Sequence, residues 1–205
     1  MTACAQSLTL DKILDMGTLV LLPTETVWGV AARARDNAAI DKLYAAKGRE
    51  FSKPLAVCVK SLAHAQSFGK FDETSKRLAQ RHWPGPLTLV VPATAKALES
   101  FDARAFGQNT QQKTIAFRCP DTDWRESLCT APLVLTSANK SGEPDALTER
   151  AACAAIPSAQ ALPYKGSLSG KPSTIISCID GELTVLRQGE LRPEIDRKRD
   201  KQKND

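Results

Sequence analysis

The hydrophobic and polar positions of this chain form short apolar runs separated by segments with helical spacing. Apolar runs of four to eight residues bounded by turn residues are typical of buried strands, and apolar residues three and four apart are typical of helices that pack on one face. The runs predict strands at 18–22, 55–59, 87–91, 114–118, 132–136, 173–178 and 183–187. The helical spacing predicts helices at 8–15, 37–47, 61–67, 73–82, 123–129 and 147–154.

Two local signals support this assignment. The predicted helix 37–47 has Asp36 or Asn37 as a candidate N-cap, and one of its faces carries Ile40, Leu43, Tyr44 and Lys47. The pair Asp180-Gly181 stands between two apolar runs, a pattern that favours a β-hairpin. Because strands and helices intermix without strict alternation, we predict an α/β (α+β) fold, with a twisted mixed β-sheet flanked by helices.

Length and composition indicate a single globular domain. The chain has 205 residues, 42% hydrophobic and 25% charged, which suits one domain with a substantial core. We expect residues 1–193 to form this domain and the polar segment 194–205 to be a flexible tail. No apolar stretch approaches the roughly 20 residues that cross a bilayer, and the N-terminus does not resemble a signal peptide. We therefore expect a cytoplasmic protein that does not insert into membranes.

Cysteine and histidine usage argues against disulfide and zinc chemistry. The six cysteines form no C-x-x-C pair and are expected to be reduced and mostly buried. With only two histidines, a zinc site built by the protein is not expected. The net charge of +5 favours anionic partners such as nucleotides or RNA, although it does not by itself establish nucleic-acid binding.

Polar chemistry interrupts the chain at four predicted strand ends. Thr24-Glu25-Thr26 follows the strand 18–22, and Arg118 closes the strand 114–118. The cations Lys47, Arg49 and Lys53 precede the strand 55–59, and Ser137 and Asn139 follow the strand 132–136. Ligands in open α/β sheets bind where strands terminate, so these groups are expected to converge on one anionic ligand.

Each of these elements also has a purely structural interpretation. Thr24 and Ser137 are residue types that cap turns, and the three cations are of a kind that usually stays solvated on a surface. Arg118 is harder to explain in this way, because it ends an apolar run and is held by the nearby Pro120, away from open water. The coincidence of all four elements favours a functional site.

Several other chemistries are excluded by spacing. The stretch GSLSGKPS at 166–173 is one residue short of a phosphate-binding loop, and Pro172 removes a backbone donor where the helix would begin. The same stretch carries Leu168 where a nucleophile elbow needs serine. Cys58 lies between two valines and is expected to be a strand residue that is buried or lines a pocket, without support for a role as nucleophile.

The motifs PTETVWG, KGREFSKPL, WPGPLTLV, FRCP, TSANKSGEP, PSTI and VLRQG occur in this order between Leu8 and Gly189. In this order they resemble the YrdC/Sua5 family of threonylcarbamoyl-AMP synthases, in the short form without a second domain. The resemblance implies a concave basic site on a twisted sheet that binds ATP, L-threonine and bicarbonate or CO2. It also implies a product that supplies the N6-threonylcarbamoyl modification of adenosine 37 in tRNA through a downstream threonylcarbamoyl transferase complex.

The same resemblance assigns residues to the two substrates. Lys47, Arg49 and Lys53 would hold the triphosphate and serve as the catalytic cations. The residues implied for ATP are Lys47, Arg49, Lys53, Thr114, Asn139 and Arg187. The residues implied for L-threonine are Thr24, Thr26, Cys58, Arg118, Ser137 and Ser173, with Arg118 on the carboxylate. Two positions depart from the family pattern, because Trp28 stands where Tyr or Phe is common and Cys58 where long-form members often carry His.

The implied reaction needs no protein nucleophile, because the amine of threonine attacks CO2 and the resulting carbamate attacks the α-phosphate of ATP. Fixed cations and Mg2+ would stabilise the charge that develops on the leaving pyrophosphate. We expect Mg2+ to arrive with ATP, because the sequence shows no carboxylate cluster suited to an independent metal site. Two alternatives remain open: a non-catalytic module that binds double-stranded RNA or tRNA, and a regulatory or maturation subunit with the same domain.

Overall fold

A single mixed sheet organises the described part of the chain, which in this computed structural model comprises residues 10–108, 112–129 and 132–193. Nine strands follow the order β10-β9-β4-β6-β3-β7-β2-β1-β8, and β5 pairs with the first three residues of β6. The strands are β1 Leu19–Pro23, β2 Trp28–Arg33, β3 Ala56–Cys58, β4 Leu87–Pro92, β5 Phe106–Gln108, β6 Lys113–Arg118, β7 Leu133–Ser137, β8 Ala159–Ala161, β9 Thr174–Ile179 and β10 Glu182–Arg187.

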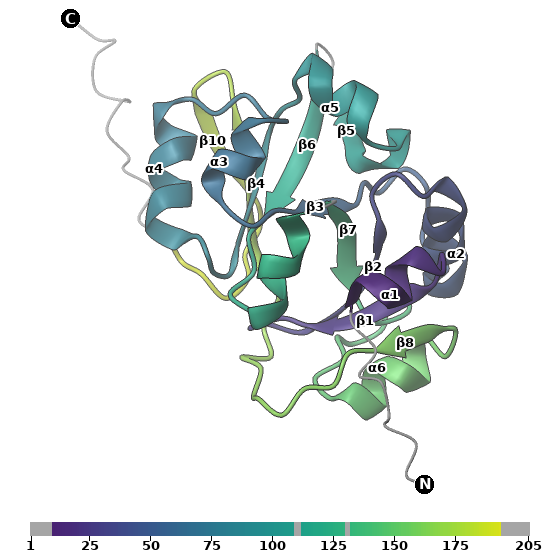
Figure 1. The fold of residues 1–205 in the computed structure, drawn as a ribbon. Helices are drawn as coiled ribbons and strands as arrows, with labels where there is room; N and C mark the ends of the chain where they lie inside the picture. The colour runs from purple at the N-terminus through teal and green to yellow at the C-terminus, as the bar shows by residue number, and fades with distance from the viewer. Residues whose placement is uncertain (1–9, 109–111, 130–131, 194–205) are drawn as a thin grey trace, which may run out of the picture.

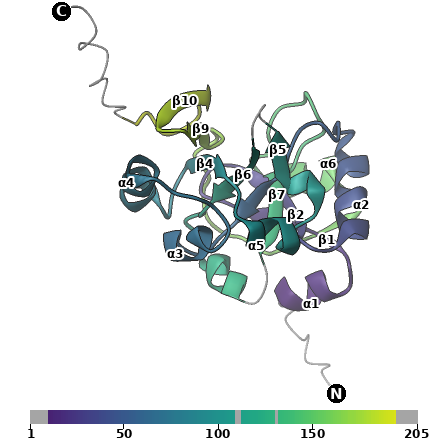
Figure 2. The same ribbon diagram turned by 90° about the horizontal axis from the view of Figure 1, so that it is seen from above.

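Helices flank this sheet on both sides, with α3 and α4 at one end and α2 at the other (Figure 2). The α-helices are α1 Leu10–Asp15, α2 Asn37–Lys47, α3 Leu62–Gln66, α4 Glu73–His82, α5 Ala95–Ser100 and α6 Glu149–Ala155, and the 3-10 helices are η1 Ala103–Ala105 and η2 Asp123–Cys129. None of the helices within the described ranges is long and apolar enough to cross a membrane. The predicted tail at 194–205 and the first two residues of the predicted helix 8–15 lie outside the described residues.

The predicted fold class is confirmed, and the differences concern short elements. The strands β2, β5 and β8 and the helix α5 were not predicted. β2 reads WGVAAR and is buried along almost its whole length, so it shows neither polar alternation nor β-branched enrichment. β8 is three residues long and carries no periodic signal. The segment 123–129, predicted to be an α-helix, is the 3-10 helix η2.

The helix α2 forms as its sequence predicts. The side chain of Asp36 caps its start by accepting a hydrogen bond from the amide of Ala39 at 2.9 Å. Gly48 ends it with a φ of 57°, a left-handed conformation that glycine adopts without steric cost. All four residues of the predicted inner face are buried, including Lys47. The last turn of α2 therefore brings a cation into the protein interior.

The two faces of the sheet carry separate apolar clusters. Along β6, Ile115 and Phe117 point into the larger cluster, while Thr114, Ala116 and Arg118 point to the opposite face. On that opposite face the smaller cluster, with α1 and η2, covers only β1, β2, β3 and β7. It contains Leu10, Ile13, Leu14, Val20, Leu22, Ala31, Cys58, Trp124, Leu128, Leu133 and Leu135.

The remaining part of this face, over β4, β6 and β9, is left partly open. Val90, Ala116 and Ile175 are only half-buried, although they lie in central strands. The sheet is strongly twisted, so that β1 runs across the direction of β4 and β6 (Figure 1). The loop after β1 is thereby brought toward β6, where Glu25 meets Arg118. This boundary between the covered and the open part is where the polar residues gather.

Candidate active site

The turn between β1 and β2 is built around the hydroxyl of Thr24. This hydroxyl donates to the carbonyl of Val27 at 2.6 Å and accepts hydrogen bonds from the amides of Thr26 and Val27, each at 3.2 Å. Since its one proton is used, the 2.8 Å contact between the two threonine hydroxyls has Thr26 as its donor. Thr24 therefore serves the turn itself, and Thr26 keeps lone pairs that can accept from a ligand.

Arg118 forms a buried ion pair with the residue between these threonines. The side chain of Arg118 is only 4% exposed, and its Nη2 donates to Oε1 of Glu25. Its Nη1 donates to the carbonyl of Leu87 at 3.4 Å. The second carboxylate oxygen of Glu25 accepts a hydrogen bond from the amide of Asp121 at 3.2 Å. The expectation that Arg118 lies away from open water is confirmed.

A hydroxyl pair and a second arginine adjoin Arg118. Thr88 lies directly opposite Arg118 in the antiparallel pair β4–β6, and its hydroxyl lies 2.8 Å from that of Ser173. Ser173 is contacted in turn by Arg187, whose Nη2 lies 2.8 Å from its carbonyl oxygen and 3.2 Å from its hydroxyl oxygen. Residues from β4, β6 and the β9–β10 hairpin therefore meet at one place.

Lys47 and the turn after β7 form the second polar cluster. Lys47 is 3% exposed, and its ammonium group donates to the carbonyl of Ser137 at 2.5 Å, to Oδ1 of Asn139 at 3.2 Å and to the carbonyl of Asn139. The hydroxyl of Ser137 donates to Oδ1 of Asn139 at 2.5 Å, and the amide of Ser141 donates back to the Lys47 carbonyl at 2.9 Å. Lys47 thus holds the turn that presents Ser137 and Asn139.

The pKa of Lys47 is lowered by its position in the protein interior. Burial, together with the nearby charge of Arg49, lowers the pKa of Lys47 to about 8, against the opposing effect of Asp145. Its three hydrogen-bond acceptors are all neutral oxygens, so no carboxylate of the described residues contacts the ammonium directly. A further anion near Lys47 would favour its charged form.

The loop from Gly48 to Pro54 carries the other two predicted cations. Arg49 folds back on the loop, with its Nε 3.1 Å from the carbonyl of Lys53 and its Nη2 3.0 Å from that of Pro54. The hydroxyl of Tyr44 also donates to the Lys53 carbonyl, at 2.9 Å. The Lys53 side chain is 54% exposed and lies 3.5 Å from the carboxylate of Glu50. These contacts fix the loop backbone and leave Lys53 accessible to a ligand.

Thr114 and Cys58 are both buried on the site face of the sheet. Thr114, 5% exposed, pairs with Gly107 of β5, where a Cβ would come within 2.7 Å of its hydroxyl oxygen. Cys58 lies beside Arg118 in the parallel pair β3–β6 and belongs to the smaller apolar cluster. Burial raises the pKa of the Cys58 thiol to about 12, although the Arg118 charge opposes this. Cys58 is therefore a neutral wall of the site.

The two polar clusters share one electrostatic environment. Burial lowers the pKa of Arg187, and the charges of Arg118 and Arg49 lower it further, while Asp145 acts in the opposite direction. The charge of Asp145 also opposes the lowering of the Lys47 pKa. The cations of α2, the 48–54 loop, β6 and β10 are thus close enough to influence one another, as the strand-end pattern predicts.

Sequence reasoning missed one residue of this arrangement and did not identify the partner of another. Thr88 was not a candidate, although a hydroxyl inside the otherwise apolar run 87–91 is a usable signal. The sequence allows Glu25 to orient a Lys or Arg side chain or Mg2+ and does not choose among them, because its partner Arg118 lies 93 residues away and has no local signal.

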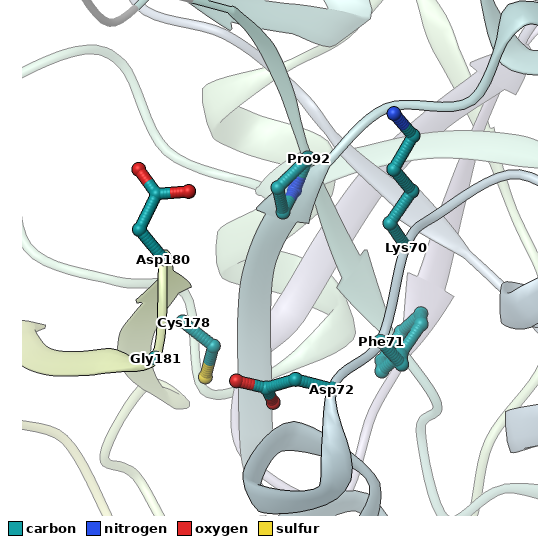
Figure 3. A pocket seen from close by; sticks show the side chains of 7 residues that line it. All are labelled: Lys70, Phe71, Asp72, Pro92, Cys178, Asp180 and Gly181. Carbon is teal, nitrogen blue, oxygen red and sulfur yellow. The ribbon is translucent and has the colours of Figure 1, made fainter.

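A cavity of about 340 Å3 lies away from this site, at the far ends of β4 and β9 (Figure 3). It is lined by Pro92 and Cys178 at those ends, whereas Thr88 and Ser173 lie at the opposite ends. Burial, with a contribution from Asp72, raises the pKa of the Cys178 thiol to about 12, so this wall of the cavity is uncharged and unreactive. None of the predicted site residues lines it, and the polar network described above is the better candidate for function.

The described residues carry free thiols and no ready-made metal site. Among these residues, no group of three or more His, Cys, Asp or Glu side chains is arranged to hold a metal ion. Cys58, Cys119, Cys153 and Cys178 are free thiols.

Most of the chain matches a known protein family. Residues 12–189 match the model of the Sua5/YciO/YrdC family, which carries the description "Telomere recombination". A threonylcarbamoyl-AMP synthase of Chromohalobacter salexigens is 33% identical over 186 residues, covering 85% of this chain and 96% of that protein. One of Bacillus subtilis is 31% identical, covering 89% of this chain and 53% of that protein.

Among solved structures, Pyrococcus abyssi Sua5 complexed with L-threonine superposes with a TM-score of 0.76 at 31% identity, covering 86% of this chain and 52% of that one. Escherichia coli YciO superposes with a TM-score of 0.74 at 19% identity, which is evidence for the fold alone. The chain thus spans about half the length of the Bacillus and Pyrococcus proteins and nearly all of the Chromohalobacter protein.

Proposed function

Because this chain belongs to the Sua5/YciO/YrdC family, we propose that it is a threonylcarbamoyl-AMP synthase. It condenses L-threonine, bicarbonate or CO2 and ATP into L-threonylcarbamoyladenylate and pyrophosphate. The observation that carries this proposal is that two buried cations, Lys47 and Arg118, each lie among polar groups at strand ends, and that Arg49, Arg118 and Asp145 all act electrostatically on Arg187. Relatives that share most of this chain are named for the same activity, and one related structure holds L-threonine.

The threonine subsite is assigned to the surroundings of Arg118. A planar guanidinium can grip a carboxylate through two N–H groups, which suits the amino-acid carboxylate. Thr26 follows Glu25, the partner of Arg118, and Ser173 bonds Thr88, which lies opposite Arg118 in the sheet. Ser137 extends the polar lining toward Lys47. Cys58 and Thr24 act as structural neighbours of this subsite, since one is an apolar wall and the other holds the turn.

The ATP subsite is assigned to the surroundings of Lys47. Lys47, Arg49 and Lys53 supply the positive charge that a triphosphate needs, and Asn139, Thr114 and Arg187 complete the nucleotide contacts. Arg187 touches Ser173 directly, so the nucleotide and threonine subsites adjoin in this assignment. Holding the two substrates side by side makes the attack of carbamate on the α-phosphate effectively intramolecular.

The chemistry follows from this arrangement. The threonine amine attacks CO2 and releases one proton, which gives a carbamate. A carbamate oxygen then attacks the α-phosphorus, and the bond to the bridging oxygen breaks as pyrophosphate leaves. Fixed cations offset the repulsion between the two anions and stabilise the leaving group. Mg2+ enters with the ATP phosphates as part of that substrate.

The wider setting is part of the same proposal. The product supplies the N6-threonylcarbamoyl modification of tRNA adenosine 37 through a downstream transferase complex, in the cytoplasm, where free thiols such as those described here persist. The competing function is a non-catalytic module for double-stranded RNA or tRNA, in which the same cations contact phosphates without turnover.

Pyrophosphate release tests the proposal. Purified protein with ATP and Mg2+ alone is expected to release little pyrophosphate, and L-threonine together with bicarbonate is expected to start the reaction. Omission of either small substrate should stop it, because no side chain of the site is placed to activate water against the α-phosphate. Equal release without threonine would indicate a hydrolase. No release under any condition, together with tight binding of double-stranded RNA, would favour the binding module.

A further inference from the structure

The loop carrying Glu25 is fixed from three sides. The backbone amide of Ser169 donates a hydrogen bond to the carbonyl of Glu25, and that of Gly170 donates one to the carbonyl of Thr26, both with a length of 3.0 Å. The indole of Trp124 donates to the carbonyl of Pro23 at 2.6 Å, and the amide of Asp121 donates to the Glu25 carboxylate at 3.2 Å. The Glu25 side chain, 22% exposed, therefore has a defined position before any substrate binds.

This fixed carboxylate determines where the Arg118 guanidinium lies. The guanidinium has five N–H groups, and the described residues engage one with Glu25 and one with the carbonyl of Leu87. Each Nη nitrogen retains a second N–H, and the group is planar, so two anchored positions set the direction of the rest. Those remaining N–H groups lie on the sheet face that carries Thr88 and Ser173.

Glu25 could either hold Arg118 in place for substrate or compete with substrate for it. The two roles predict opposite effects of a Glu25 variant on the KM for threonine. If Glu25 occupied the place of the substrate carboxylate, it would compete with substrate and would have to move away. Moving would leave a largely buried carboxylate without Arg118 and without the Asp121 amide, and unpaired buried charges are costly. The anchored loop offers no compensating contact, which favours a carboxylate that stays in place.

We propose that Glu25 is a positioning residue that holds the Arg118 guanidinium for the carboxylate of the amino-acid substrate. The inference rests on the proposed function, because it requires an amino acid at Arg118. Glu25 makes no contact with substrate in this account and acts only through Arg118.

The test is the kinetics of Glu25→Gln in both substrates. Glutamine keeps the size of the side chain and the acceptor for the Asp121 amide but removes the charge that holds Arg118. The KM for threonine is expected to rise by about 10- to 100-fold, while the KM for ATP changes by less than about threefold, since a misplaced binding group costs rates of this order. Glu25→Asp keeps the charge with a shorter reach and should lie between glutamine and wild type.

Two controls separate positioning from general damage. Glu73→Gln removes an exposed glutamate that pairs with Lys76 on α4 and should leave both KM values unchanged. In an Arg118→Lys background, Glu25→Gln should have little further effect on the threonine KM, because residues that act through one another are not additive. Thermal melting of each variant shows whether the fold is retained.

The outcomes distinguish this inference from the function on which it rests. Wild-type protein without threonine-dependent pyrophosphate release would overturn both. Wild-type turnover with an unchanged threonine KM in Glu25→Gln would overturn the positioning role alone. A lowered threonine KM would show that Glu25 competes with substrate, and equal increases in both KM values with a lost melting transition would show a purely structural role.

Discussion

Two cations are buried in this protein to nearly the same degree, yet their partners differ. Lys47 is 3% exposed and Arg118 is 4% exposed. Lys47 is surrounded by neutral oxygens of the Ser137–Asn139 turn, whereas Arg118 is paired with the carboxylate of Glu25. A lysine whose direct contacts are neutral oxygens leaves more of its positive charge available to a ligand, and a paired arginine loses net charge but gains a fixed orientation.

The difference matches the two substrates that we assign. A triphosphate carries several negative charges and tolerates many orientations, so a point charge suits it. An amino-acid carboxylate carries one charge in a planar group, so an oriented fork suits it. The comparison therefore predicts that variants of the two cations fail in different ways.

The largest effect on stability is expected for Arg118→Ala. This change leaves the Glu25 carboxylate largely buried without its partner, so the free energy of unfolding should fall by about 3 kcal/mol. Adding Glu25→Gln in the same chain should recover part of this loss, because the orphaned charge is then removed. Chemical denaturation measures both effects, and a single variant as stable as wild type would contradict the role of the ion pair.

Lys47→Met is expected to affect ATP binding more than stability. Methionine keeps much of the side-chain length but removes the charge, so ATP affinity should fall by about 10- to 100-fold, the range for lost hydrogen bonds to charged groups. The loss of unfolding free energy should be smaller than for Arg118→Ala, because no carboxylate is orphaned. Nucleotide titration and denaturation test this, and an ATP affinity equal to wild type would remove Lys47 from the ATP site.

The pH dependence of ATP binding should reveal Lys47. Its pKa is lowered to about 8, so Lys47 is charged below pH 8 and neutral above it. The affinity of the free protein for ATP should fall by up to about tenfold between pH 7 and pH 9, and this decline should be absent in Lys47→Met. Direct binding is the suitable measurement, because turnover also depends on the CO2–bicarbonate equilibrium. A decline that persists in the variant would implicate another group.

The pH dependence of stability should have the opposite sign to that of ATP affinity. The pKa of Lys47 is lower in the folded chain than its usual value of 10.5, so the penalty for burying its charge is fully present below pH 8. That penalty is relieved as the pH rises from about 8 toward 10.5. The contribution of Lys47 to the free energy of unfolding should therefore increase over this range, an effect that Lys47→Met removes.

The smallest effects are expected for the two loop cations, the half-buried Arg49 and the exposed Lys53. Arg49→Ala and Lys53→Ala should each weaken ATP binding by about three- to tenfold and change stability by less than about 0.5 kcal/mol, as is usual for surface substitutions. Lys76→Ala is a matched control for Lys53, because both lysines pair with a glutamate three residues earlier. If Lys53→Ala binds ATP as tightly as Lys76→Ala, Lys53 does not contact the nucleotide.

Local patterns in the sequence predicted much of this molecule, because they report short-range physics. The inner face of α2, its cap at Asp36 and the hairpin at Asp180-Gly181 follow from periodicity and turn chemistry, and all are present. The strands β2 and β8 could not be predicted from local patterns, since one is buried on both faces and the other is three residues long.

The site shows the same limit. The sequence marked Arg118 as unusual, because it closes an apolar run, and it placed Lys47 on the inner face of a helix while leaving a solvated surface charge as the default interpretation. It could not identify the partners of these cations, since Glu25 is 93 residues from Arg118 and the Ser137–Asn139 turn is about as far from Lys47. Long-range pairing depends on how the sheet twists, and no short window of sequence encodes that.

The division of labour between the two cations is tested most directly by Arg118→Lys, with steady-state kinetics in both substrates. Lysine keeps the charge beside Glu25 but loses the planar fork that suits a carboxylate. The account predicts that the KM for threonine rises by at least about tenfold while the KM for ATP changes by less than about threefold. An equal rise in both values, or a rise for ATP alone, would contradict it and place Arg118 in the nucleotide site.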